Sequence, residues 1–196
     1  EDIDLNTDDF IARVNSDLIG KLVNIASRCS GFINKQFDNK LSESIDNQDL
    51  HNEFIDSSDS IAQHYESREF SKAMRQIMLL ADKANRYIEE KKPWLMIKDE
   101  SQAHEVQRVC TQGLNLFRTL MIYLTPVIPG IADKSKELFN EKKWEWSDIS
   151  SPILGKKIQK YKPLLTRIDK EKVKKMMEIP KEESKNSKSP NNLISI

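Results

Sequence analysis

Two polar residues, Asn24 and Arg28, have the side-chain types and the spacing that binding of a polar ligand requires. An amide donates and accepts hydrogen bonds and a guanidinium donates several in a planar fork, so together they can read the polar edge of a ligand. Four residues apart, they lie one turn apart on a helix. Apolar residues recur at steps of three and four on the other side of this predicted helix, at Leu18, Leu22, Ile25, Cys29 and Ile33. The pair therefore lies on an outer face, where a binding site and ordinary solvated surface are both possible.

Trp94 is the second candidate, and its position follows from its neighbour Pro93. Because proline disfavours helical geometry in the residue before it, we expect the helix over residues 68–91 to end near Lys92 and Trp94 to lie in a turn. An indole in such a turn can stack on a planar ligand. A large aromatic residue at a helix end also commonly packs against its own protein, so both interpretations stay open.

Motifs for catalysis and metal binding are missing from the sequence. The three histidines are dispersed and form no pair four residues apart, so we expect no metal site. No phosphate-binding glycine loop, dinucleotide fingerprint or nucleophile elbow occurs. The carboxylates on either side of Trp94 could form an acid–base pair, but charges at helix ends are far commoner. We therefore expect no catalytic residues in this chain.

Composition indicates a helical, water-soluble chain. Its 196 residues suffice for one domain with a real core, and 32% charged residues with only 5 glycines favour a bundle with a charged exterior. The two cysteines, Cys29 and Cys110, fall in apolar stripes without a nearby partner cysteine, so we expect buried reduced thiols. No run of 18 apolar residues and no signal peptide occurs, which predicts a cytoplasmic protein without a membrane partner.

The net charge of zero conceals an asymmetry. Residues 156–188 contain twelve Lys and Arg against five Asp and Glu, a net charge of +7, and the remainder is therefore about −7. A body this acidic would not bind nucleic acid by charge alone. Any recognition of RNA must therefore be local and specific.

Hydrophobic periodicity predicts an antiparallel bundle of about five helices. We find no convincing alternation with a period of two, so no sheet is expected. Gly113, inside the fourth helix, indicates a close helix crossing because glycine there otherwise costs about 1 kcal/mol. Trp144 and Trp146 are expected to pack against the bundle. The predicted helices cover residues 7–38, 48–65, 68–91, 100–125 and 130–140, and a basic C-terminal arm with a short helix near residues 169–178 follows.

Several segments together resemble the C-terminal helical anticodon-binding domain of bacterial methionyl-tRNA synthetases, members of the class I aminoacyl-tRNA synthetases. The resemblance covers nearly everything from Ile3 to about Glu178. Its motifs are VNIASRCSGFINKQFD at 23–38, ESREFSKAMRQIM at 66–78, ANRYIEEKKPW at 84–94, GLNLFRTLMIYLTPVIP at 113–129, PILGKKI at 152–158 and RID at 167–169.

The resemblance implies recognition of the CAU anticodon by Asn24, Arg28 and Trp94. Readers of single-stranded RNA stack loop bases on aromatic rings and hydrogen-bond their Watson–Crick edges, and these three side chains offer both kinds of contact. A supporting role, bracing the turn that carries Trp94, falls to Asn85, Arg86, Tyr87 and Pro93. The alternatives are the equivalent domain of another class I synthetase and a helical module that binds only protein.

For the whole enzyme, the resemblance implies attachment of methionine to initiator and elongator tRNA(Met) with ATP and Mg²⁺, Zn²⁺ remaining an open addition. No cofactor is expected in this chain, because the HIGH and KMSKS signatures of the catalytic domain are absent from it. We expect a bundle over residues 1–155, a basic arm over 156–179 that packs back toward the catalytic domain, and a flexible tail over 180–196.

Overall fold

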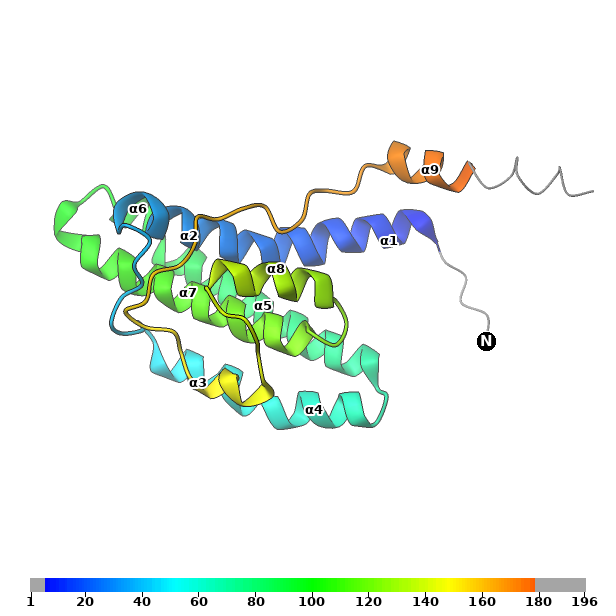
Figure 1. Ribbon diagram of the computed structural model, residues 1–196, viewed down its shortest axis with the longest axis horizontal. Helices are drawn as coiled ribbons and strands as arrows, with labels where there is room; N and C mark the ends of the chain where they lie inside the picture. Colours follow the sequence, from blue (N-terminus) through cyan, green and yellow to red (C-terminus); the bar gives the residue numbers. More distant parts are fainter. Residues whose placement is uncertain (1–5, 179–196) are drawn as a thin grey trace, which may run out of the picture.

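The computed structural model describes residues 6–178, where regular structure is helical apart from one isolated backbone bridge between Lys40 and Lys157. Long helices lie side by side, and a non-helical segment crosses back over them (Figure 1). The elements are α1 (Thr7–Arg13), η1 (Val14–Val23), α2 (Asn24–Gln36), α3 (Gln48–Asp56), α4 (Ser58–Glu66), α5 (Phe70–Lys91), α6 (Pro93–Met96), η2 (Glu100–Gln102), α7 (Ala103–Leu124), α8 (Pro129–Leu138), η3 (Trp146–Ser150) and α9 (Lys170–Glu178). The all-α prediction is confirmed, and α9 is the short helix expected in the arm. The tail predicted for residues 180–196 lies outside the described residues.

The first predicted helix is continuous but not uniform. The backbone stays in the right-handed helical region through both junctions, at Val14 and Asn24, yet η1 between them is a π-helix. A π segment pairs each carbonyl with the fifth residue onward, is rare, and is frequent at functional sites. The predicted inner residues of α2 are buried nonetheless, so the apolar stripe survives the wider turns.

The first helix begins at Thr7 as predicted, and Asn6 caps it, because its side chain accepts hydrogen bonds from the Asp8 and Asp9 amides. The helix predicted over residues 48–65 is interrupted at Ser57, where α3 ends and α4 begins. The Ser57 hydroxyl donates to the Glu53 carbonyl at 2.9 Å, and such bonding back to the fourth preceding carbonyl bends helices.

The central helix is α7, whose residues from Val109 to Leu124 are all buried. It packs against α2, α5, α3, α6 and α8, so it has no solvent face over this length. Gly113 lies at the crossing with α2, where a β-carbon would come within 2.5 Å of the Cys29 sulfur. The predicted close crossing is therefore confirmed, and both cysteines are buried free thiols.

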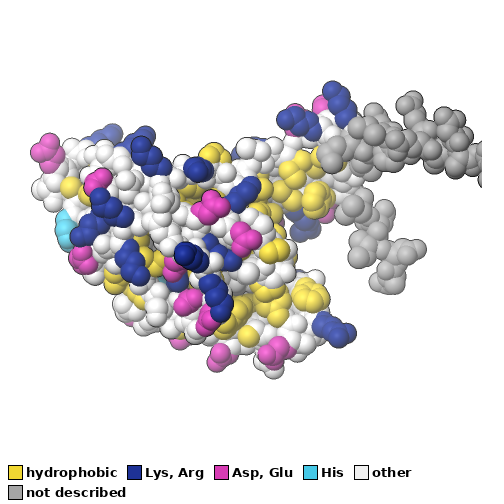
Figure 2. All heavy atoms as spheres, viewed as in Figure 1, with side chains coloured by type: hydrophobic (Ala, Val, Ile, Leu, Met, Phe, Trp, Pro, Cys, Tyr) yellow, Lys and Arg dark blue, Asp and Glu magenta, His cyan; other side chains and the backbone are white. Residues whose placement is uncertain are grey.

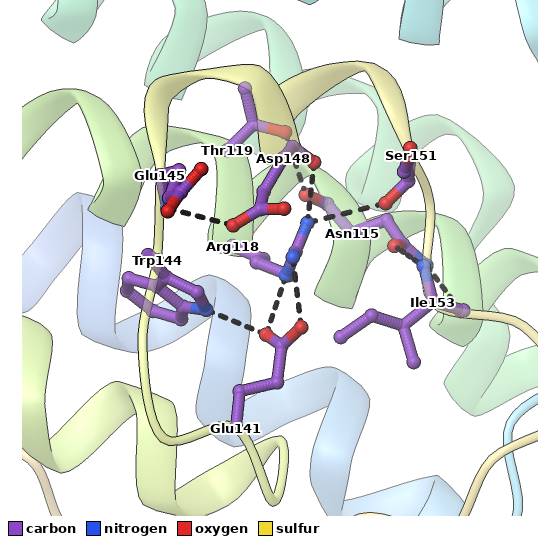
Figure 3. Close-up of polar contacts among 9 residues, drawn as sticks. All are labelled: Asn115, Arg118, Thr119, Glu141, Trp144, Glu145, Asp148, Ser151 and Ile153. Carbon is purple, nitrogen blue, oxygen red and sulfur yellow. Dashed lines mark hydrogen bonds and ion pairs between the residues drawn. The ribbon is translucent and has the colours of Figure 1, made fainter.

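Polar side chains on α7 fasten the non-helical segments to the bundle. Arg118 forms a double ion pair with Glu141, with 2.7 and 2.9 Å contacts, and donates to the carbonyls of Asp148 and Ser151. Trp144 donates from its indole to the same Glu141 carboxylate at 2.6 Å. Figure 3 shows Glu141, Asp148 and Ser151 around the guanidinium and Trp144 reaching the Glu141 carboxylate. The segment after α8 is thus held by a fully paired buried charge.

The expected packing of the two late tryptophans is confirmed. Trp144 is buried, and its ring lies 6.4 Å from that of Phe139. The Trp146 ring centre lies 5.1 Å from that of Tyr123 and 6.5 Å from that of Tyr65.

Within residues 6–178, the structure contains no helix with the length and apolar composition needed to cross a bilayer.

Candidate nucleic-acid interface

The turn that carries Trp94 is a single helical turn, α6. Lys92 adopts a left-handed conformation, with φ 51° and ψ 58°, which ends α5, and residues other than glycine rarely take this conformation. Pro93 then occupies the first position of α6, where its missing N–H costs nothing. Pro93 is buried and Trp94 is half-buried, so the proline anchors a partly accessible indole. The predicted helix stop is confirmed, and the expected turn is the single helical turn α6.

Arg28 and Trp94 meet at this surface. The guanidinium carbon of Arg28 lies 5.3 Å from the centroid of the Trp94 ring, which is within cation–π range. Arg28 also forms a 3.3 Å ion pair with Glu89 on α5, and the Arg28 and Glu89 side chains are 43% and 61% exposed. Two residues 66 positions apart in the sequence therefore share one solvent-accessible site.

Asn24 begins α2 one turn before Arg28, at the point where the π segment ends. The two residues are about 6 Å apart along the helix axis. Asn24 is partly exposed, and within residues 6–178 its side-chain amide has no hydrogen-bond partner. Its donor and acceptor are therefore available to a ligand.

The four supporting residues have different positions. Asn85 donates to the Lys21 carbonyl at 3.2 Å, which ties α5 to η1 just before Asn24. Tyr87 is buried and donates to Asp46 at 2.9 Å, whereas Arg86 is exposed. These contacts fix α5 against the first helix and the segment over residues 39–47, and only Pro93 is part of the α6 turn itself.

A charged cluster holds the end of α5. The Asp46 carboxylate, only 5% exposed, contacts Lys91, the last residue of α5, at 2.7 Å. Burial opposes its ionisation, but hydrogen bonds with Glu105, Lys91 and Tyr87 keep the pKa of Asp46 below its usual range. The hydrogen bond with Asp46 also raises the pKa of Glu105 above its usual range. This cluster positions the residue that precedes the left-handed turn.

Glu89 is the site residue that sequence reasoning missed as a partner of Arg28. Nothing in the sequence links the two residues, because they are 61 positions apart and belong to different helices.

Within residues 6–178 there is no group of three or more His, Cys, Asp or Glu that could bind a metal. The arrangement offers an aromatic face, an accessible guanidinium and a free amide, which suit recognition of a planar polar base.

A family model described as the anticodon binding domain of methionyl tRNA ligase matches residues 40–178. The chain belongs to this family. Trp94 lies inside the matched range of the anticodon-binding domain, and Asn24 and Arg28 precede it. The candidate site thus combines a residue of the matched range with two from the first helix.

Curated relatives extend the similarity to the first helix. Methionine–tRNA ligases from two strains of Francisella tularensis subsp. tularensis, FSC 198 and SCHU S4, are each 47% identical over 190 residues. The alignment covers 97% of this chain but only 28% of each relative. The anticodon-binding domain described here therefore spans little more than a quarter of the length of these relatives.

Solved structures show the same fold. The apo form of Mycobacterium tuberculosis methionyl-tRNA synthetase aligns with a TM-score of 0.77 over 84% of this chain and 35% of its own, at 19% identity. The Mycobacterium tuberculosis enzyme in complex with methionyl-adenylate aligns with a TM-score of 0.73 over 82% of this chain and 33% of its own, also at 19% identity. At this identity the likeness concerns the fold alone.

Proposed function

We propose that this anticodon-binding domain reads the CAU anticodon of tRNA(Met), initiator and elongator alike, through Asn24, Arg28 and Trp94. The observation that carries the proposal is the 5.3 Å contact between the Arg28 guanidinium and the half-buried Trp94 ring. Of the four supporting residues, Asn85 and Tyr87 fix α5 against its neighbours and Pro93 anchors α6, whereas Arg86 is exposed beside them.

The free energies of the competing contacts favour exchange with a base. A base that stacks on this face of Trp94 moves Arg28 aside and breaks its ion pair with Glu89. An exposed ion pair is worth about 0.2–1 kcal/mol and an exposed cation–π contact about 0.5–1 kcal/mol. A base–aromatic stack returns about 1–3 kcal/mol, and each hydrogen bond from the charged guanidinium about 1.5–3 kcal/mol. The resting contacts therefore position Arg28 without locking it.

Selectivity for cytosine follows from its Watson–Crick edge. That edge presents two acceptors and one amino donor, which Arg28 and the Asn24 amide can satisfy together. Uracil inverts part of this pattern and leaves a polar group unpaired. Such a group costs about 1–3 kcal/mol, which corresponds to about 5- to 150-fold in affinity.

The whole protein, in this proposal, attaches methionine to tRNA(Met) in the cytoplasm. ATP and Mg²⁺, with Zn²⁺ as an open addition, would serve a catalytic domain in the same polypeptide. The described part of the arm, residues 156–178, supports this, because it leads back along the first helix to Asn15 and Asp8. Hydrophobic side chains also gather near the start of that helix (right in Figure 2), and Phe10 there is 48% exposed. We propose that this end faces the catalytic domain.

Anticodon substitution tests the function. The intact protein should bind tRNA(Met) with a CAU anticodon about 5- to 150-fold more tightly than the same tRNA with UAU. Arg28→Ala should reduce this ratio toward one, and Arg28→Lys, which keeps the charge but loses the planar fork, should restore it only in part. Equal losses for both anticodons in Arg28→Ala would make Arg28 a backbone contact and contradict the assignment.

A further inference from the structure

Hydrogen bonds hold the arm along α2 and η1 of the bundle. Asn34 on α2 accepts from the Tyr161 amide at 3.0 Å, and Asn15 on η1 pairs with both backbone groups of Ile168 at 2.8 and 3.0 Å. Upstream, the Ile158 amide donates to the Asn39 carbonyl at 2.9 Å. Figure 1 shows the arm following the first helix back toward its start. The arm is thus a fixed part of the surface.

A groove of about 910 Å³ lies between this arm and α8. Four exposed lysines line it, Lys134 and Lys142 from the α8 side and Lys160 and Lys162 from the arm. Among residues 6–178, none of the four has an ion-pair partner, whereas neighbouring Lys143 pairs with Glu145 at 2.6 Å. The groove is therefore lined by lysine charges that no carboxylate among residues 6–178 neutralises through an ion pair.

Two carboxylates in the groove do not cancel this charge. Glu141 is committed to Arg118 and to the Trp144 indole. Glu137 lines the groove as well, so a net positive charge remains. Figure 2 shows Lys and Arg side chains spread over this side of the molecule among scattered Asp and Glu. In a bundle whose remaining residues carry about −7, such a groove is the place where an anion meets least repulsion.

The arm, which forms one wall of the groove, lies along the same helix that carries Arg28. Arg28 faces α5 and α6, whereas Asn34, six residues later and about 120° around α2, faces the arm. Between them the outer face of α2 carries the small residues Ser27 and Gly31. A helix is about 10–12 Å across, so one RNA stem-loop can contact both edges.

We propose that the groove between α8 and the arm binds backbone phosphates of the same RNA whose anticodon meets Arg28 and Trp94. This rests on the proposed function and adds a second contact that does not depend on sequence. Phosphate contacts fix the position and register of a nucleic acid, and base contacts specify it. The lysines supply affinity that the acidic bundle cannot supply by itself.

Salt dependence of binding tests the proposal. In the intact protein, Lys160→Gln/Lys162→Gln should weaken binding of CAU tRNA(Met) roughly tenfold or more at 0.1 M salt. The slope of log affinity against log salt should decrease by about 1 for each lysine. The loss should be the same for CAU and UAU anticodons, and Lys143→Gln, the matched control, should change neither quantity. An unchanged melting temperature shows that the fold is intact.

Two results would overturn the groove assignment and leave the proposed function standing. One is unchanged affinity and slope in the lysine variant while Trp94→Ala weakens binding. The other is tight binding of inorganic tripolyphosphate that the lysine variant loses without any loss of tRNA, which would make the groove a small-anion site. Conversely, a wild-type protein that does not distinguish CAU from UAU, but whose lysine variant shows the lower slope, would refute anticodon reading alone.

Discussion

Replacing Trp94 by alanine gives the sharpest test of the reading site, because it removes the aromatic face while leaving Arg28 and Asn24 in place. The lost base stack is worth about 1–3 kcal/mol, so affinity for CAU tRNA(Met) should fall about 5- to 150-fold. The lost Arg28–Trp94 contact does not add to this, since a base stacking there breaks that contact in the wild type as well. Trp94→Phe keeps a smaller aromatic face and should recover part of the affinity.

The measurement is equilibrium binding of the intact protein to tRNA, with thermal melting beside it. Trp94 packs partly against the core, so Trp94→Ala should also lower the melting temperature. Trp146→Ala is the matched control, because Trp146 is another half-buried indole, packed on Tyr65 and Tyr123 instead of on an arginine. It should destabilise the protein and leave tRNA affinity unchanged. Wild-type affinity in a folded Trp94→Ala, or an equal loss for an unrelated RNA hairpin, would refute the reasoning.

Three further predictions concern the framework behind the site. Gly113→Ala should destabilise the protein despite alanine's advantage of about 1 kcal/mol in helices, because the new methyl group would meet the Cys29 sulfur at 2.5 Å. Adding Cys29→Ala should restore the free energy of unfolding, and additive losses of the two substitutions in urea unfolding would contradict this reasoning. Arg118→Met leaves the Glu141 carboxylate without its ion-pair partner. It should lower the free energy of unfolding by about 3–5 kcal/mol, as breaking a buried ion pair does. A loss below 1 kcal/mol in urea unfolding would show that the pair does not hold the segment after α8. Burial and the nearby Arg118 charge lower the pKa of His51 from 6.5, so the unfolded chain takes up the proton first, and the free energy of unfolding should fall as pH drops below 6.5. His51→Gln should remove this part of the pH dependence, and identical slopes for both proteins in urea titrations between pH 5 and 7.5 would exclude His51 as its source.

Local signals in the sequence predicted much of the fold. Periodicity located the long helices, because the burial of one face depends on spacing within each helix. Pro93 predicted where α5 ends, since its steric effect acts on the adjacent residue. Gly113 predicted a close helix crossing, because only the absence of a β-carbon allows such an approach, and the structure shows that the partner is α2.

Other features could not be predicted from the sequence, because no distinct residue pattern accompanies them or because they depend on contacts with distant segments. No residue pattern in the sequence predicted the π segment η1, because its wider turns are compatible with the same apolar stripe. The break at Ser57 depends on one hydroxyl bonding backward, which serine does at some positions and not at others. Arg118 looked like one more polar residue of a helix, and only the fold supplied its carboxylate and two carbonyls.

The sequence by itself placed Asn24 and Arg28 on one outer face of a helix and Trp94 just beyond the end of another. Resemblance to a family suggested that they act together, since spacing along a chain cannot say which helices are neighbours. Only the tertiary structure decided that α2 and α6 bring Arg28 to 5.3 Å from the Trp94 ring. It also decided that Glu89 holds the guanidinium there and that the basic arm lies along the opposite edge of α2. Packing of the buried faces against α7 set these relations, because the buried residues determine which outer faces meet.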